Sequence, residues 1–198
     1  MDAVSRERIL DASLKELESQ GITRYRIKRV ADLAGVSVSL LYSYFTDREG
    51  LLAETIIVRY HEEVMRAAVR FVAPLAGVTT ADELRHAMQH MIDDAERPER
   101  YHSRTVRVES FSFANHNDRA TEGIQDSQRE AGQFIIAHVQ PIVDRELLVP
   151  SIDAAAFARV WYALFFGRVA LQGDHPLAAS LDEWRTSLYA IAESMIRS

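Results

Sequence analysis

Cysteine is absent from the 198-residue chain, and this absence excludes several kinds of site. Without thiols the chain has no disulfide framework, no thiolate zinc site, no iron–sulfur cluster and no cysteine nucleophile. Long hydrophobic runs are missing as well, because no apolar stretch reaches the roughly 18 residues that a membrane span needs. The first residues also lack the apolar core of a signal peptide. We therefore expect a cytoplasmic protein with no membrane partner.

Glycine and proline are scarce, with eight and five residues, while 47% of the chain is hydrophobic and 26% is charged. This composition is typical of a globular protein and argues against collagen-like, low-complexity and disordered classes. The sequence also lacks the Gly-x-Gly-x-x-Gly, P-loop, His-Glu-x-x-His and Gly-x-Ser-x-Gly signatures of common enzyme sites. We expect no catalytic residues, no cofactor and no enzymatic activity.

Acidic charge prevails in the chain as a whole, but not near its N-terminus. The formal net charge is −6, whereas residues 1–60 carry nine basic and nine acidic side chains. Within residues 21–48 there are five basic side chains against two acidic ones. A local basic patch on an acidic body can orient DNA toward one face. The alternative is an ordinary solvated helical surface.

Apolar residues recur at helical spacing along the chain, and neither a strand pattern nor a repeat appears. Capping-box spacing marks three helix starts, at Thr46/Glu49, Thr80/Glu83 and Ser180/Glu183. Glycine and proline mark several ends, and Pro141 predicts a kink. The expected helices cover about residues 6–20, 26–34, 38–45, 48–72, 81–97, 99–114, 119–148, 153–171 and 181–196. The fold class is all-α.

Residues 26–45 have the spacing of a helix-turn-helix, with the turn sequence Ala-Gly-Val-Ser. Ala31 is small enough for two helices to approach closely, Gly35 accepts the backbone conformation of the turn, and Ser37 can cap the second helix. In a DNA-binding unit of this kind, the second helix enters the major groove. A purely structural helical corner could use the same turn.

Residues 6–54 resemble the N-terminal domain of TetR-family transcriptional regulators. The matching positions are Ile9-Leu10-Asp11-Ala12, Gly21, Val30-Ala31, Ala34-Gly35-Val36-Ser37, Leu41-Tyr42, Tyr44-Phe45, Arg48-Glu49 and Leu51-Leu52. The resemblance implies a three-helix helix-turn-helix DNA-binding domain over residues 1–54. It implies a helical effector-binding and dimerisation domain over residues 55–198.

The resemblance carries DNA-binding roles to nine positions, namely Arg26, Ser37, Val38, Ser39, Leu40, Tyr42, Ser43, Tyr44 and Arg48. Two departures from the family pattern stand out. Tyr25 and Arg26 replace the usual pair of hydroxyl residues, and Leu40 replaces a threonine that commonly contacts phosphate. Specificity can then come from thymine-methyl contacts, from serine hydroxyls and from Arg26. For Leu40, packing inside the domain is the alternative.

For the second domain, the resemblance implies a cavity for a small-molecule effector. The candidate lining residues are large or polar side chains on central helices: His86, His90, Tyr101, Arg104, Phe111, Trp161 and Phe165. The aromatic candidates could equally be core residues. His86 and His90 have the i, i+4 spacing of two metal ligands, but no third ligand is indicated. We therefore expect no metal site, and we expect these histidines to be polar anchors for an organic ligand instead.

The last two predicted helices carry apolar surface over residues 156–171 and 184–196. In the family that it resembles, such helices pair with their counterparts in a homodimer. A twofold dimer presents two recognition helices and predicts a palindromic double-stranded DNA operator. The resulting hypothesis is a ligand-responsive transcriptional regulator, a repressor that a small molecule releases from its operator. The alternative is a helical ligand-binding dimer that has lost DNA binding.

Overall fold

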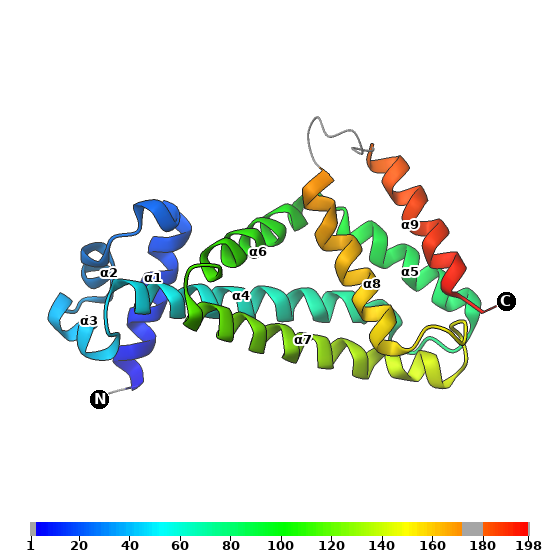
Figure 1. Ribbon diagram of the computed structural model, residues 1–198, viewed down its shortest axis with the longest axis horizontal. Helices are drawn as coiled ribbons and strands as arrows, with labels where there is room; N and C mark the ends of the chain where they lie inside the picture. Colours follow the sequence, from blue (N-terminus) through cyan, green and yellow to red (C-terminus); the bar gives the residue numbers. More distant parts are fainter. Residues whose placement is uncertain (1–2, 172–179, 198) are drawn as a thin grey trace. The chain divides into compact units, whose positions relative to one another are not determined.

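The computed structural model describes residues 3–171 and 180–197, and in these ranges every extended regular element is a helix (Figure 1). This confirms the all-α prediction for the described part of the chain. The helices are α1 (Ala3–Arg24), α2 (Ile27–Ala34), α3 (Val38–Tyr44), α4 (Arg48–Val72), α5 (Ala81–Ala95), α6 (Tyr101–Ala114), α7 (Asp118–Asp144), α8 (Ala154–Gly167) and α9 (Leu181–Met195). Short 3-10 helices follow α4, precede α6 and follow α8, over Ala73–Leu75, Pro98–Arg100 and Arg168–Leu171. Within the described ranges, no helix is both long and apolar enough to cross a bilayer.

Contacts divide the chain into two compact units. The N-terminal unit contains the residues up to Glu63 together with Val106–Ser127, and the C-terminal unit contains Val64–Thr105 together with the residues from Gln128 onward. The helices α4, α6 and α7 each contribute residues to both units. The domain boundary expected after residue 54 falls inside α4, and it stays a prediction.

The first four helices share a small apolar core in the N-terminal unit. Its buried side chains are Ile9, Leu17, Val30, Leu41, Phe45, Leu51, Leu52 and Ile56. Gly21, with φ of 68° and ψ of 173°, interrupts the helical backbone of α1 at the predicted stop. The chain then turns toward α2, because this left-handed φ costs glycine little.

A buried polar network lies at the start of α2. Tyr25 is 3% exposed, and its hydroxyl contacts the Ser13 hydroxyl, which in turn contacts the hydroxyl of Thr55 on α4. The guanidinium of Arg48 donates to the carbonyl oxygens of Ile22 and Tyr25 at 3.4 and 3.3 Å. It also lies over the Tyr25 ring, 5.6 Å from the centroid. These bonds tie the beginning of α2 to α1 and α4.

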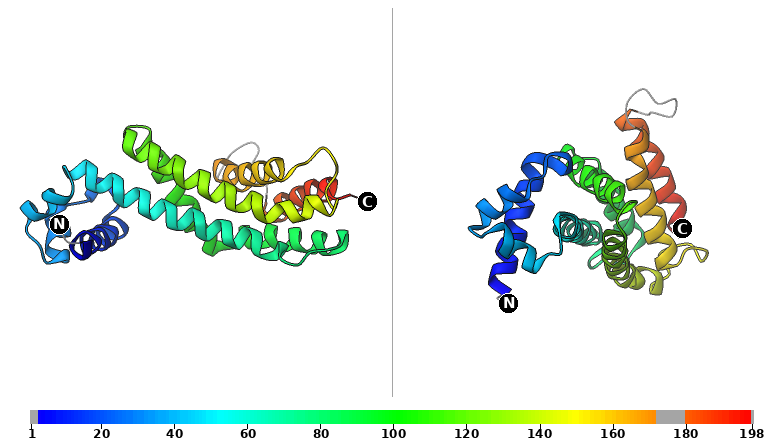
Figure 2. Two further views of the ribbon diagram at one scale, coloured as in Figure 1. Left: turned by 90° about the horizontal axis from the view of Figure 1, so that it is seen from below. Right: turned by 60° about the vertical axis from the view of Figure 1, so that its left-hand side comes forward.

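Parts of α6 and α7 complete the N-terminal unit. The ring centroids of Tyr60 and Phe111 lie 5.6 Å apart. Gly123 of α7 faces Ile57 of α4, and the two helices run side by side (Figure 2). Ion pairs join Arg59 to Glu109 and Arg119 to Glu54. The unit is therefore larger than the three helices predicted from the sequence.

An apolar core also fills the C-terminal unit, with contributions from α5, α8 and α9. Its buried members include Leu84, Met88, Ile92, Phe157, Trp161, Leu188 and Ala192. Four aromatic side chains, Phe71, Phe157, Trp161 and Phe165, form a cluster with neighbouring centroids 5.4 to 6.3 Å apart. Such packing explains why α8 is apolar over much of its circumference.

The capping residues place most helix starts where the sequence predicts them. Thr80 and Ser180 both form complete capping boxes, with Glu83 and Glu183 respectively. The start of α4 differs from the prediction, because the side chain of Asp47, one residue after Thr46, accepts from the amide of Gly50 at 2.7 Å. Asp47 lies directly before the first helical residue, where a carboxylate best reaches that amide.

Candidate DNA-binding surface and effector site

The turn between α2 and α3 has the geometry that the Ala-Gly-Val-Ser sequence predicts. Gly35 has φ of 65° and ψ of 38°, a left-handed conformation that ends α2. The amide of Val36 donates to the Ala31 carbonyl at 3.0 Å. The Ser37 hydroxyl then accepts from the amide of Leu40 at 3.0 Å and so caps α3. The predicted roles of Gly35 and Ser37 in the turn are confirmed.

One face of α3 is buried and the opposite face is open. Leu41 is fully buried, whereas Leu40 and Tyr42 are 42% and 41% exposed. The hydroxyl residues Ser37, Ser39 and Ser43 are also exposed, and Val38 and Tyr44 are partly exposed. The structure thus brings seven of the nine predicted DNA-binding residues to the accessible face of α3 and its cap. Leu40 is not a core residue.

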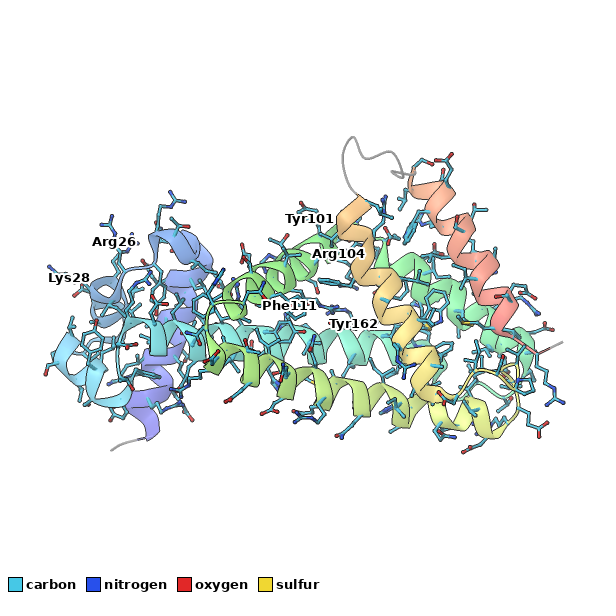
Figure 3. All side chains as sticks on the ribbon, in the orientation of Figure 1. Arg26, Lys28, Tyr101, Arg104, Phe111 and Tyr162 are labelled. Atoms are coloured by element: carbon cyan, nitrogen blue, oxygen red, sulfur yellow. The ribbon has the colours of Figure 1, made fainter. Side chains whose placement is uncertain are left out.

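Cationic side chains flank this face. Arg26 directly precedes α2, with extended backbone at φ of −128° and no capping bond from its side chain. Arg26 and Lys28 are exposed and project outward from the N-terminal unit (Figure 3). Arg24 and Arg29 are exposed too, but Arg24 donates to a backbone carbonyl of α1 and Arg29 pairs with the buried Glu16 at 3.2 Å. Arg26 and Lys28 make no ion pair with any described residue.

Arg48 differs from the other predicted phosphate contacts. Its guanidinium is engaged by the carbonyls of Ile22 and Tyr25, and it also pairs with Glu49. Arg48 therefore holds the start of α2 in place, and a direct phosphate contact stays a prediction.

Residues 9–55 match the family model of bacterial regulatory proteins of the tetR family. The HTH-type transcriptional regulator BetI of Cronobacter sakazakii is 32% identical over 98 residues, which cover 48% of this chain and 47% of BetI. The chain belongs to the TetR family. It matches about half the length of this curated relative.

Solved structures share the TetR-family fold over nearly the whole chain. A TetR-family protein of Mesorhizobium loti MAFF303099 has a TM-score of 0.69 at 16% identity, covering 97% of this chain and 95% of that one. A transcriptional regulator of Saccharomonospora viridis, solved in complex with choline, has a TM-score of 0.65 at 20% identity and covers all of both chains. At these identities the similarity establishes the fold.

The two predicted effector histidines of this TetR-family chain lie on α5 in different surroundings. His90 lines a surface pocket of about 410 Å³ together with Asp94 and Arg100. Hydrogen bonds of 2.7 and 3.1 Å from Arg100 hold the pKa of Asp94 below its ordinary value. The Nδ1 atom of His86 lies 2.9 Å from a backbone carbonyl of its own helix and does not line this pocket. Among the described residues, no group of three potential metal ligands comes together.

The remaining effector candidates separate into three places. Tyr101, at the start of α6, is 58% exposed, and Arg104 donates to the carbonyl of Ala95. Trp161 and Phe165 lie together in the aromatic cluster of the C-terminal unit. Phe111 belongs to the N-terminal unit, where it packs against Tyr60. The structure therefore brings only Trp161 and Phe165 into direct contact.

Sequence reasoning missed Glu96 as a functional candidate. Its buried carboxylate lies 3.5 Å from Arg104 and 3.7 Å from Arg168. The guanidinium of Arg168 also lies over the ring of Trp184, 5.6 Å from its centroid. The available signal was weak, since one acidic residue at the end of a predicted helix is usually solvated.

Proposed function

We propose that this chain is a DNA-binding transcriptional regulator that inserts α3 into the major groove of its operator. One observation carries the proposal: an exposed face on a capped short helix is flanked by the outward-pointing cations Arg26 and Lys28. Phosphate contacts from such cations position a protein on DNA, and side chains of the inserted helix read the base edges.

The residues divide by role in this proposal. Arg26 binds phosphate or a base edge, Arg48 holds the start of α2, and the Tyr42 hydroxyl contacts the DNA backbone. The groups that face the bases come from the first two turns of α3: Val38, Ser39, Leu40 and Ser43. The aromatic ring of Tyr44 braces the helix.

We also propose a homodimer formed through α8 and α9. Val160 on α8 and Leu181 on α9 are exposed apolar side chains of the kind that a bundle between two subunits buries. A twofold dimer predicts a palindromic operator. Both helices belong to the C-terminal unit, so dimerisation leaves α3 accessible.

The proposed effector site is the aromatic cluster around Trp161. This side chain is 1% exposed, and its indole N–H has no hydrogen-bond partner among the described residues. A buried donor without a partner is costly, and a ligand with an acceptor atom would satisfy it. A small molecule bound here would shift the dimer toward a state that releases the operator, which makes the protein a repressor.

Fluorescence tests the effector site directly, because the chain contains only two tryptophans. In a Trp184→Phe variant the emission comes from Trp161 alone. A screen of small metabolites should include choline first, since the Saccharomonospora viridis regulator holds choline. A saturable change in Trp161 emission, absent from a Trp161→Phe variant that retains Trp184, supports the site.

Selection of bound duplexes from a random DNA pool tests the main proposal. We expect a palindromic winner whose affinity falls as salt rises. Arg26→Ala should weaken binding and reduce the salt slope by about one per lost phosphate contact in each subunit. Arg145→Ala is the matched control, since it removes an exposed arginine of the C-terminal unit and should leave affinity unchanged.

The second candidate function is a ligand-binding dimer without DNA binding. The absence of any charged side chain from α3 favours it. The same selection separates the two candidates when it is repeated with a metabolite mixture. A failure to enrich any duplex under both conditions would refute the DNA-binding proposal.

A further inference from the structure

The accessible face of α3 offers DNA only methyl, methylene, aromatic and hydroxyl groups. The helix sequence is Val-Ser-Leu-Leu-Tyr-Ser-Tyr, with no basic, acidic or amide side chain. Leu40 is 42% exposed on this face although it is a large aliphatic residue. Exposing such a side chain to water is unfavourable, and burying it against an apolar partner is worth about 25 cal/mol per Å².

Two side-chain hydrogen bonds hold the backbone of Leu40. The Ser37 hydroxyl accepts from its amide at 3.0 Å, and the Ser43 hydroxyl donates to its carbonyl at 2.6 Å. Both bonds lie within α3 and its cap, so Leu40 is held at a fixed position in the first turn. The N-terminal turns of a recognition helix are the part that contacts base edges.

The major groove offers one apolar group that distinguishes a base, the 5-methyl group of thymine. Guanine is usually read by two bonds from arginine or lysine, and adenine by asparagine or glutamine. Within α3 none of these four residue types is present. The charge around this face suits DNA as the occupant, since Arg26 and Lys28 lie exposed on the neighbouring α2 segment.

We propose that Leu40 is a specificity residue that packs against the 5-methyl group of a thymine in each operator half-site. The inference rests on the proposed DNA-binding function and adds to it the base that is read. Ser37 and Ser43 act as positioning residues for Leu40, and the operator contains a thymine at the matching position of both half-sites.

Replacing thymine by uracil tests this proposal, because only the methyl group is removed. Each thymine of the selected operator is replaced in turn, and the affinity of the purified full-length protein is measured by fluorescence anisotropy. At one symmetric position, we expect a loss of about fourfold per half-site, and about 15-fold when both half-sites carry uracil. Substitution at the other positions should change affinity less than twofold.

The Leu40→Ala variant assigns the effect to its residue. Its side chain is exposed, so the variant should fold, and it should bind thymine and uracil operators equally. The matched control is Leu33→Ala, which truncates an exposed leucine of α2 and should retain full discrimination. A Ser43→Ala variant should lose part of the discrimination while its salt dependence stays unchanged.

The outcomes separate this inference from the function on which it rests. If no duplex is selected, the DNA-binding proposal itself fails. If an operator is bound but uracil is tolerated at every position, thymine reading is overturned and DNA binding stands. If Leu40→Ala discriminates as strongly as the unchanged protein, another residue reads the methyl group and the assignment to Leu40 is wrong.

Discussion

Gly123 provides a test of packing in the N-terminal unit. A Cβ atom at this position on α7 would lie 2.6, 2.7 and 2.9 Å from Cδ1, Cγ1 and Cγ2 of Ile57 on α4. Favourable carbon contacts lie at roughly 3.5 to 4.0 Å, so Gly123→Ala displaces the whole Ile57 side chain. Overpacking of this kind costs about 1–3 kcal/mol, and the gain in helix propensity returns about 1 kcal/mol. We expect a net loss of up to about 2 kcal/mol.

Gly132, on the same helix, is the matched control. A Cβ atom added there meets nothing within 4 Å, so Gly132→Ala should stabilise the protein by about 1 kcal/mol through helix propensity alone. Urea unfolding followed by circular dichroism measures both variants. In an Ile57→Ala background all three obstructing atoms are gone, and Gly123→Ala should then become stabilising. If Gly123→Ala stabilises the unchanged chain as much as Gly132→Ala does, the close approach of α4 and α7 is refuted.

Three further predictions concern caps and titration. Thr80→Ala removes one capping box and should cost about 1 kcal/mol in urea unfolding, whereas Thr79→Ala, which leaves the cap in place, should cost less. Burial raises the pKa of Tyr25, so the folded state holds the phenol proton more tightly, and stability should fall as pH rises above about 10; a Tyr25→Phe variant with a flat difference from pH 8 to 11 would contradict this. Arg100 lowers the pKa of Asp94, so the stability from this pair is present above about pH 4 and is lost as pH falls through the lowered value. An Asp94→Asn variant should therefore show a weaker acid dependence of its melting temperature.

Local features of this fold could be predicted from the sequence because the residues that cause them are adjacent. The Gly35 turn, the Ser37 cap and the boxes at Thr80 and Ser180 each depend on side chains within a few positions of the backbone groups that they satisfy. The exposure of Leu40 could not be predicted in this way. A helix of seven residues carries too little periodicity to separate a buried leucine from an exposed one.

Long-range contacts account for what the sequence could not supply. Arg48 is bound by carbonyl oxygens 26 and 23 residues away, so its structural task was invisible in the pattern around it. Phe111 was grouped with Trp161 by residue type, but it packs in the other unit. Which helix faces meet is set by tertiary packing, to which helical periodicity gives only the apolar stripe.

The composition of the N-terminal unit bears on how such regulators can be recombined. Glu54 pairs with Arg119, Arg59 pairs with Glu109, and Ile57 packs against Gly123, so half of each pair comes from a segment some 50 to 65 positions later. A hybrid gene that joins residues 1–54 of this chain to the remainder of another regulator would separate these partners. Exchange of operator specificity between regulators therefore requires transplanting Val106–Ser127 along with the head, or changing only the outward residues of α3.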